Sequence, residues 1–464
     1  MRWCLDRWRG RAALFVVALA AAAPSAAGPV NSSQDPQARM EEIEKAGDKL
    51  KARQPGAVDE AYKLLQEAVK KKTDLPPARL MLARLMMHQQ LQDYHQMVRG
   101  QLELAASEEP GHPEIYLTNA GLALSEGRVT DALLNGDKAL ALTAADRWTA
   151  AQKKSMQTDA RKVLAAGYEA RRDWPAARAQ LAALLDADPK NGQLRSRLAR
   201  AVFFLPGDKE DEAYRELIQA VKDDTVLEPP TVSMARLWNA KGDMKKAREW
   251  FEKAVKGEPN SARVHVAYGD WLMQQNEIEQ AKLHIDQAAK INANDPEVQK
   301  FQGLIARIQG DLGTAERIFK QILNSAPDDT FARNQLALVL ADQSGDAPHK
   351  LAVQYAELNA KANQKSPEAL ATLGYVYYRA GNVDEAIKML QLAVNAGNGQ
   401  LSPDTAYYLA ACIYEKDKEK AEDVKKFLKA ALDAKGLFVY KKDAQKLLDR
   451  VAKAPPPKAS SSAK

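Results

Sequence analysis

Apolar and polar positions along the chain follow a helical period, and the helical pattern itself recurs. Apolar residues stand three and four positions apart in paired segments, and a Gly-Asp or Gly-Asn step commonly divides each pair. Alternating runs of Val, Ile and Thr, which would indicate strands, are nearly absent. The pattern therefore predicts an all-α fold. The segments with the same frame are 165–184, 235–254, 267–288, 301–322 and 374–390.

Each repeat places small residues at fixed positions. A glycine or another small residue is followed twelve positions later by alanine, as in the pairs Gly303–Ala315 and Gly374–Ala386. Small residues at this spacing allow the two helices of a pair to approach closely where they cross. The repeats begin 34 to 37 residues apart, at Thr158, Gly192, Glu228, Ala262, Pro296, Thr330, Pro367 and Pro403. A period near 34 with two amphipathic segments per repeat is typical of a helix–turn–helix solenoid.

The repeat resembles the tetratricopeptide repeat family between about residues 37 and 438, most strongly from 158 to 400. The resemblance implies a right-handed superhelical solenoid of stacked helix–turn–helix repeats, in which the first helix of each repeat lines a concave groove. It also implies a role in binding proteins or peptides. The positions that carry the resemblance are small residues at Gly374 and Ala386, an aromatic at Tyr377, a large apolar residue at Leu390, alanine at Ala393 and closing prolines such as Pro189, Pro259 and Pro327.

Composition shifts along the chain predict six segments. The repeats before residue 158 match only loosely, and the stretch 145–157 is interpreted as an insertion between two repeats. The predicted segments are a signal peptide (1–27), a linker (28–36), degenerate repeats (37–157), the repeat array (158–438), a C-terminal capping helix (439–453) and a disordered tail (454–464).

The first 27 residues have the order of a secretory signal peptide. Four arginines precede the apolar run Ala12–Ala23, and the small residues of APSAAG follow it. The run is shorter than the ~20 residues that span a bilayer. Cleavage near Ala27 predicts an exported protein, periplasmic or extracellular, with no membrane span in the mature chain and an association with the envelope. An uncleaved N-terminal membrane anchor is the alternative.

Charge and cysteine content exclude two classes of interpretation. The formal net charge is +6, but removal of residues 1–27 leaves 63 basic and 60 acidic residues. Such a balance argues against a nucleic-acid partner. Cys4 leaves with the signal peptide, so Cys412 has no partner for an internal disulfide. Cys412 is predicted to be a buried, unreactive thiol.

No catalytic motif accompanies the repeats: the sequence has no G-x-S-x-G, Walker loop, H-E-x-x-H or C-x-x-C. Of the six histidines, His88 and His95 come close enough in sequence to suggest a helical metal pair, with solvated residues beside a turn as the alternative. The sequence predicts a protein that is not an enzyme and that needs no metal and no cofactor.

Two groups of residues are candidates for binding in the predicted groove. Tyr375, Tyr378, Tyr407 and Tyr414 fall on the stripe of the first helices that points away from the second, whereas Tyr377 fills the core position. Tyrosine offers a large contact area with a polar tip, which suits recognition. Packing between adjacent first helices is the alternative for these tyrosines.

The second group lies in the middle of the array, at equivalent positions of consecutive repeats. It consists of Arg200 and Phe203, then Arg236 and Asn239, then Asp270. Two neighbouring guanidinium groups would suit a carboxylate or an acidic segment. An ion pair between Arg236 and Asp270 is the alternative.

The sequence as a whole predicts a non-catalytic exported scaffold that binds a protein or peptide partner in its groove. By analogy with the family, it would serve the assembly of envelope, secretion or exopolysaccharide machinery. Two alternatives stay open: an accessory subunit that presents substrate to a separate catalytic partner, and a solenoid that binds glycans through its tyrosines.

Overall fold

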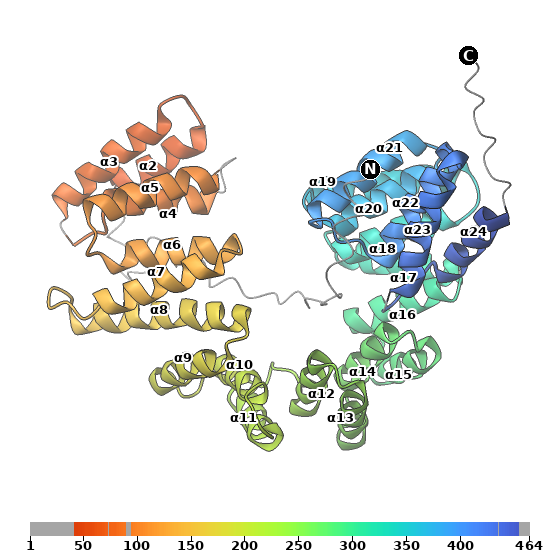
Figure 1. Cartoon of the computed structure of the whole chain (residues 1–464), viewed down its shortest axis with the longest axis horizontal. Helices are drawn as coiled ribbons and strands as arrows, with labels where there is room; N and C mark the ends of the chain where they lie inside the picture. The colour runs from red at the N-terminus through yellow and green to blue at the C-terminus, as the bar shows by residue number, and fades with distance from the viewer. Residues whose placement is uncertain (1–40, 73, 90–93, 435, 454–464) are drawn as a thin grey trace, which may run out of the picture. The chain divides into compact units, whose positions relative to one another are not determined.

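The computed structural model of the chain describes residues 41–72, 74–89, 94–434 and 436–453. Within these ranges it contains 23 α-helices, α2 to α24, and one short 3-10 helix, η2 (Figure 1). The predicted all-α fold is confirmed. The predicted signal peptide, linker and tail lie outside the described residues.

The chain forms two compact units, and the boundary between them in the sequence falls within one helix, after Ala247. The N-terminal unit contains α2 (Glu41–Ala52), α3 (Ala57–Lys71), α4 (Ala78–Gln89), α5 (Tyr94–Glu108), α6 (Pro113–Ser125), α7 (Val129–Leu142), α8 (Ala150–Arg171), α9 (Trp174–Ala187), α10 (Gly192–Phe203), α11 (Glu210–Asp223), α12 (Pro230–Lys241) and the first turn of α13 (Met244–Gly257). The C-terminal unit contains the rest of α13, then α14 (Ala262–Gln274), α15 (Ile278–Ile291), α16 (Pro296–Ile308), α17 (Leu312–Ser325), α18 (Thr330–Asp342), α19 (Asp346–Ala362), α20 (Pro367–Arg379), α21 (Val383–Ala396), α22 (Pro403–Lys416), η2 (Lys418–Lys420), α23 (Ala421–Asp433) and α24 (Lys441–Lys453).

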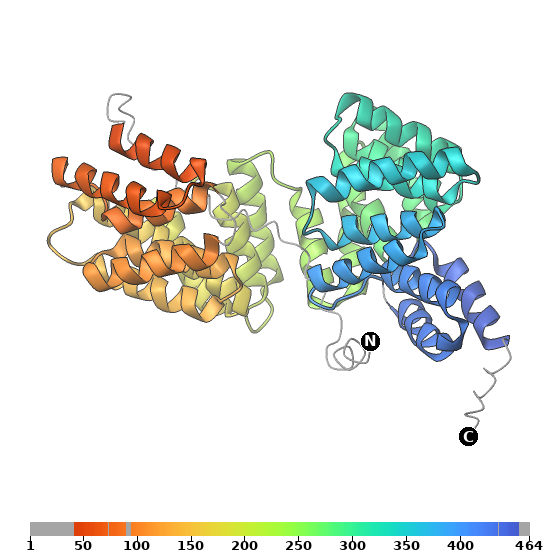
Figure 2. The same cartoon turned by 90° about the horizontal axis from the view of Figure 1, so that it is seen from above.

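Consecutive helices pack in pairs, as α14 with α15, α18 with α19 and α20 with α21 (Figures 1 and 2). The first helix of a pair is called the A helix below and the second the B helix. In the C-terminal unit each A helix also contacts the A helix of the next repeat, so α14, α16, α18, α20 and α22 form a continuous row.

The predicted repeat starts coincide closely with the observed A helices. The starts at Gly192, Ala262, Pro296, Thr330, Pro367 and Pro403 are each the first residue of a helix. The predicted insertion at 145–157 is helical for most of its length, because α8 begins at Ala150 and runs for 22 residues. Thr149 and Gln152 form a capping box at its N-terminus, which lets the helix start a full two turns before the repeat frame does.

Local sequence explains where most A helices begin and end. Asp295, Asp329 and Ser366 each cap a helix by accepting a hydrogen bond from a backbone N–H of its first turn. At the other end, Gly381 has a φ of +85°, and in that left-handed conformation it reverses the chain between α20 and α21.

Glycine at the crossing of an A and a B helix is required by close packing, as the repeat frame predicts. A Cβ atom added to Gly374 would lie 2.6 Å from Leu390 Cγ and 3.1 Å from the carbonyl oxygen of Ala386. Both partners are buried on α21. The same relation holds in the repeat before α18, where a Cβ on Gly303 would lie 2.7 Å from Phe319 Cζ.

Replacement of Gly374 by valine should lower the free energy of unfolding of the C-terminal unit by about 1–3 kcal/mol, because the added methyl groups overpack the α20–α21 crossing. Urea denaturation followed by circular dichroism measures the change. Gly313→Val is the matched control, since a Cβ there meets only Asp311 Oδ1 at 3.9 Å. An equal loss of stability in both variants would contradict the packing role of Gly374.

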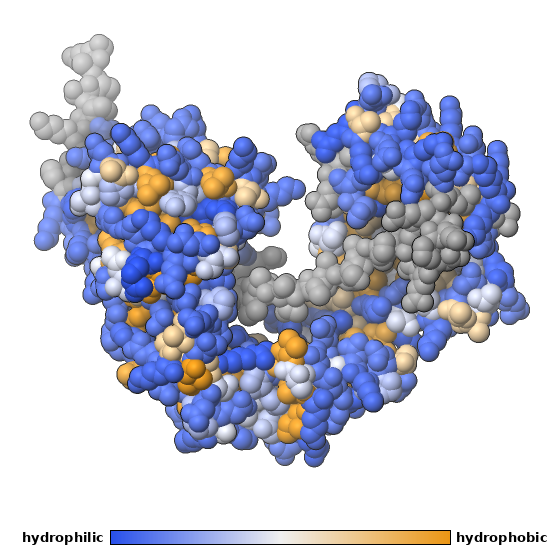
Figure 3. Space-filling model, turned by 180° about the vertical axis from the view of Figure 1, so that it is seen from behind, coloured by the Kyte–Doolittle hydropathy of each residue, from blue (hydrophilic) through white to orange (hydrophobic). Residues whose placement is uncertain are grey.

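The visible face of the molecule is mostly hydrophilic, with hydrophobic residues in small groups (Figure 3). The large apolar side chains that are most exposed, Leu134, Val226 and Leu283, are far apart in sequence. Scattered residues of this kind are normal on protein surfaces. None of the helices in the described ranges has both the length and the apolar character needed to cross a membrane.

Candidate functional site

Three tyrosines from distant parts of the C-terminal unit form a buried cluster, which we call the stack after its one parallel pair, Tyr375 and Tyr408. Tyr375 of α20 is only 2% exposed, and its ring centroid lies 4.2 Å from that of Tyr408 on α22. The third ring belongs to Tyr440, which precedes α24 and lies 5.0 Å from Tyr375 and 5.4 Å from Tyr408. Burial raises the pKa of all three hydroxyls well above 10, so each is a neutral hydrogen-bonding group.

The hydroxyl groups of this stack are held by a buried ion pair. Arg307 of α16 is 6% exposed, and its Nη2 donates to the Tyr440 hydroxyl at 2.6 Å. Tyr440 in turn donates to Asp342 Oδ2 on α18 at 2.8 Å. Asp342 Oδ1 accepts from Tyr375 at 2.7 Å and from Arg379 at 2.9 Å. The carboxylate is therefore the shared acceptor for two tyrosines and an arginine, and it lies next to a second, fully buried arginine.

A second carboxylate contacts the backbone of the same C-terminal segment. Asp404, at the start of α22, lies beside the backbone N–H groups of Val439 and Tyr440. Burial raises its pKa to about 6, although Arg307 and these two N–H groups lower it. Asp404 Oδ1 and Arg307 Nε are buried without a hydrogen-bond partner among the described residues.

Three of the four predicted tyrosines, Tyr375, Tyr378 and Tyr407, belong to this stack or contact it, whereas Tyr414 packs against the wider core. Tyr375 is buried, whereas Tyr378, Tyr407 and Tyr414 are half-buried. Tyr407 stacks on Tyr440 at 5.5 Å. In this structure Tyr375 packs between adjacent A helices, and the binding role of the four residues stays a prediction.

The expected contrast between Tyr375 and Tyr377 was wrong. Tyr377 was predicted to fill the core, but it is half-buried and donates to Glu357 Oε1 of α19 at 2.7 Å. Burial and this hydrogen bond raise the pKa of Tyr377 to about 12. Tyr375 is the deeper residue because Tyr440 covers it.

A separate aromatic cluster lies in the N-terminal unit, between α9, α10 and α12. Phe203, which is 2% exposed, meets Phe204 at 5.2 Å and Trp238 of α12 at 4.9 Å, edge to face in both cases. Trp174 stacks on Phe204 at 4.8 Å, and Arg200 lies 5.7 Å from the Trp174 ring. The rings join three consecutive repeats through their A and B helices.

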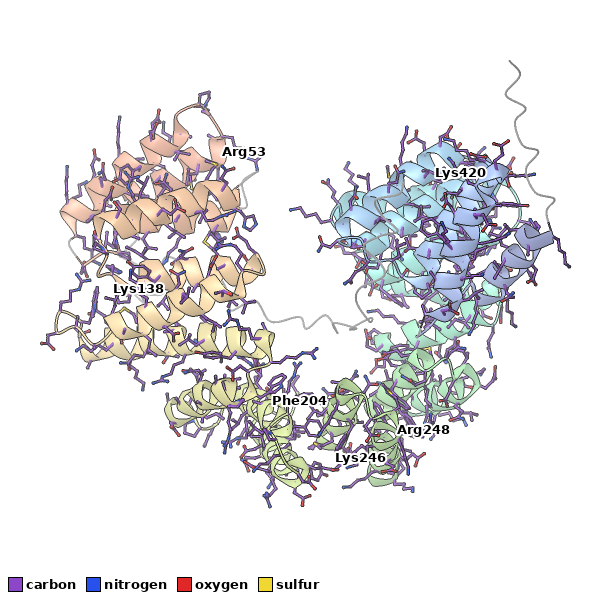
Figure 4. All side chains as sticks on the ribbon, viewed as in Figure 1. Arg53, Lys138, Phe204, Lys246, Arg248 and Lys420 are labelled. Carbon is purple, nitrogen blue, oxygen red and sulfur yellow. The ribbon has the colours of Figure 1, made fainter. Side chains whose placement is uncertain are left out.

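A pocket of about 220 Å³ opens beside this cluster and is called the mid-chain pocket. Figure 4 labels Phe204 of the cluster and Lys246 of the pocket. Lys246 Nζ lies 4.0 Å and Lys241 Nζ 4.8 Å from the centroid of the Trp238 ring. The indole Nε1 of Trp238 is buried and has no acceptor among the described residues. The pocket is lined by Phe203, Gly207, Asp208, Lys209, Glu210, Trp238, Lys241 and Lys246.

The lysines of the mid-chain pocket differ in their ion pairs. Lys209 binds Glu212 at 2.9 Å, and Lys246 lies 3.4 Å from Glu210. Lys241 is exposed and forms no ion pair within the described parts of the chain. The pocket therefore combines an apolar wall with an unpaired ammonium group and an unpaired N–H donor.

The other residues predicted for the mid-chain group each have contacts of their own. Arg236 is exposed and binds Glu228 at 2.7 Å, and Asn239 is half-buried near the end of α12. Asp270, in the C-terminal unit, accepts a hydrogen bond from Gln274 at 3.1 Å. Burial lowers the pKa of Arg200. Of this group only Phe203 lines the pocket.

Sequence analysis overlooked several residues of both sites, which are Arg307, Asp342, Tyr408 and Tyr440 in the C-terminal unit and Trp238, Lys241 and Lys246 in the N-terminal unit. One signal was available. Tryptophan is rare in this chain, and the pair Trp238 and Lys241 stands on one helix at the spacing of one turn.

Cys412 and His95, two residues considered for chemistry in the sequence, lie in different surroundings. Cys412 is buried, and burial raises the pKa of its thiol to about 12, as expected for an unreactive cysteine. His95 lies 3.1 Å from Glu126. In the described ranges no three His, Cys, Asp or Glu side chains converge to hold a metal ion.

Comparison with known proteins gives the family of the repeats. Residues 239–305 and 367–396 match two family models that are both described as tetratricopeptide repeat. The chain contains tetratricopeptide repeats (TPRs) in these two ranges. Within these two ranges the paired A and B helices are the helices of TPR units.

The similar proteins are distant. A TPR repeat-containing protein of Pseudomonas aeruginosa is 24% identical over 157 residues, which are 33% of this chain and 26% of the relative. The match thus spans about a quarter of that relative's length. Among solved structures, the APC/C hetero-tetramer Cut9–Hcn1 is 12% identical with a TM-score of 0.41, covering 88% of this chain and 95% of its own. PilW, a type IV pilus biogenesis factor, is 16% identical with a TM-score of 0.37, covering 48% of this chain and 96% of its own.

Proposed function

We propose that this TPR protein is a non-catalytic, exported scaffold that binds an acidic segment of a partner protein at its mid-chain pocket. The observation that carries the proposal is the pairing of two unused donors, the Lys241 ammonium and the buried Trp238 Nε1, on the wall of one pocket. A carboxylate of the partner would satisfy both donors.

The aromatic wall adds an apolar component to this recognition. Phe203 and Trp238 are held edge to face, so a partner side chain would meet a rigid surface that loses little entropy on binding. Lys246 keeps its ammonium over the indole ring and supplies further positive charge at the rim. An apolar side chain flanked by Asp or Glu fits these features.

Export and pathway form the second part of the proposal. The arginines, apolar run and small residues of positions 1–27 support export through a cleaved signal peptide. A balanced mature charge and an extended set of interaction repeats support assembly of envelope, secretion or exopolysaccharide machinery over binding of nucleic acid.

Reversal of charge at the mid-chain pocket should release the partner. We expect the double variant Lys241→Glu/Lys246→Glu to weaken binding at least about tenfold, because each glutamate would repel the partner's carboxylates. The measurement is crosslinking of mature protein (residues 28–464) in the envelope fraction, identification of the captured protein by mass spectrometry, and titration of the purified pair.

The matched control is Lys253→Glu. Lys253 Nζ lies 4.0 Å from the Trp250 ring, the same distance as Lys246 from Trp238, but outside the pocket. This variant should retain the partner. A double variant that melts like the wild type and still binds the partner with unchanged affinity would refute the mid-chain pocket as the docking site.

A further inference from the structure

The segment Phe438–Tyr440, called the strap below, lies across the A helices of four consecutive repeats. Tyr440 contacts Arg307 of α16, Asp342 of α18 and Tyr375 of α20, and it also stacks on Tyr407 of α22. The strap is not helical, and α24 begins only after it, at Lys441. The predicted capping helix over 439–453 is thus two elements, a strap and a helix.

The contacts of the strap are those by which a groove binds a peptide. Arg307 and Asp342 hold the Tyr440 hydroxyl from both sides, and Asp404 lies beside the backbone N–H groups of Val439 and Tyr440. Phe438 is buried and packs near Tyr407, with ring centroids 6.5 Å apart. In peptide recognition, side-chain contacts of this kind give specificity.

The groups beneath the strap are better suited to a binding surface than to a permanent core. Arg307, Asp342 and Asp404 are charged or titratable side chains, and water would hydrate them if the strap left. A core formed only for stability would be served as well by apolar residues. Asp404 Oδ1 and Arg307 Nε have no hydrogen-bond partner among the described residues, so the strap leaves part of the site's hydrogen-bonding capacity unused.

The strap is also attached so that it can leave together with α24. That helix packs on α23, and only Ala444 and Val451 are buried along its length. Gly436, with a φ of +103°, precedes the strap and interrupts the helical chain between α23 and α24. Elements with few buried apolar side chains open at a lower free energy than the whole domain.

We propose that the A-helix face of α16, α18, α20 and α22 is a peptide-recognition site that the strap fills in cis. The ligand that fits is a partner segment with an aromatic residue two positions before a tyrosine, as in Phe438-Val439-Tyr440, and it binds by displacing the strap. This site is in the C-terminal unit and is independent of the mid-chain pocket.

The test uses a fluorescent peptide with the sequence of residues 436–446 as the probe and full-length mature protein as the receptor. The variant Phe438→Ala/Tyr440→Ala empties the site, so we expect it to bind the peptide at least about tenfold more tightly than the wild type, whose own strap competes. A peptide carrying Tyr440→Ala should not bind either protein.

Two outcomes would overturn the proposal. One is a folded double variant that does not bind the peptide, which would make the strap ordinary core. The other is equal binding to variant and wild type, which would place the peptide elsewhere. The double variant leaves the mid-chain pocket unchanged. Its binding of an acidic partner therefore tests the proposed function independently of the peptide experiment.

Tyr440→Phe covers the case in which the double variant does not fold. It keeps the ring and removes only the hydroxyl between Arg307 and Asp342. In hydrogen exchange we expect the strap amides to exchange faster than those of α20, and Tyr440→Phe to accelerate the strap about tenfold without changing α20. Exchange of strap and α20 at one common rate in both proteins would show that the strap never opens by itself.

Discussion

Replacement of Asp342 by alanine should reduce the free energy of unfolding of the C-terminal unit by about 3–5 kcal/mol, the largest effect we expect of any single substitution. Its carboxylate accepts hydrogen bonds from Tyr375, Tyr440 and Arg379. Without it Arg307, which is 6% exposed, keeps its charge with no carboxylate on that side. The cost arises from the buried cation that remains rather than from the lost contacts alone.

Urea denaturation of the mature protein measures this effect, with Asp328→Ala as the control. Asp328 precedes α18 on the same loop as its N-cap, and its side chain is fully exposed. We expect that variant to change stability by less than about 0.5 kcal/mol. A small loss in Asp342→Ala, similar to the control, would mean that Arg307 finds another partner or water.

The second large effect concerns pH and Asp404, whose pKa is raised from 3.8 to about 6 in the folded chain. A carboxyl group with a raised pKa binds its proton more tightly when folded, so it favours folding at low pH. That contribution is lost as pH rises from about 4 through 6. Two pKa units correspond to about 3 kcal/mol.

Asp404→Asn removes this titration. Relative to the wild type, the variant should gain about 2–3 kcal/mol in free energy of unfolding between pH 4 and pH 7, whatever constant offset the loss of a charge near Arg307 adds. Paired urea titrations at the two pH values provide the measurement. Asp449→Asn, an exposed position on α24, should show no such difference. If the free energy of unfolding of Asp404→Asn differed from that of the wild type by the same amount at pH 4 and pH 7, Asp404 would stay ionised in the folded protein.

The two proposed sites differ in how they can be tested because they lie in different compact units. Charge reversal at Lys241 and Lys246 acts on an exposed rim and should leave the folded state intact. Changes at Tyr440 act on a buried network and alter stability as well as binding. Each experiment therefore includes a readout of folding beside the readout of binding.

What the sequence determined by itself was the local and repeating part of the structure. Repeat starts such as Pro296, Thr330 and Pro367 are first residues of helices, since N-capping residues and prolines set them locally. The Gly374–Ala386 relation also follows from sequence, because the two helices that cross there are neighbours in the chain. In a solenoid each repeat packs mainly on the next, so a short-range pattern is enough to predict the architecture.

Only the tertiary structure decided which face is covered and which residues meet there. Arg307 and Tyr440 are 133 residues apart, and no period in the sequence connects them. The helical frame predicted that Tyr375 lies on the face of the A helices that points away from the B helices. It could not predict that Tyr440 of the strap would cover this side chain. Long-range contacts of a non-repeating segment depend on packing free energy summed over several repeats, and that sum is not visible in any local stretch of the chain.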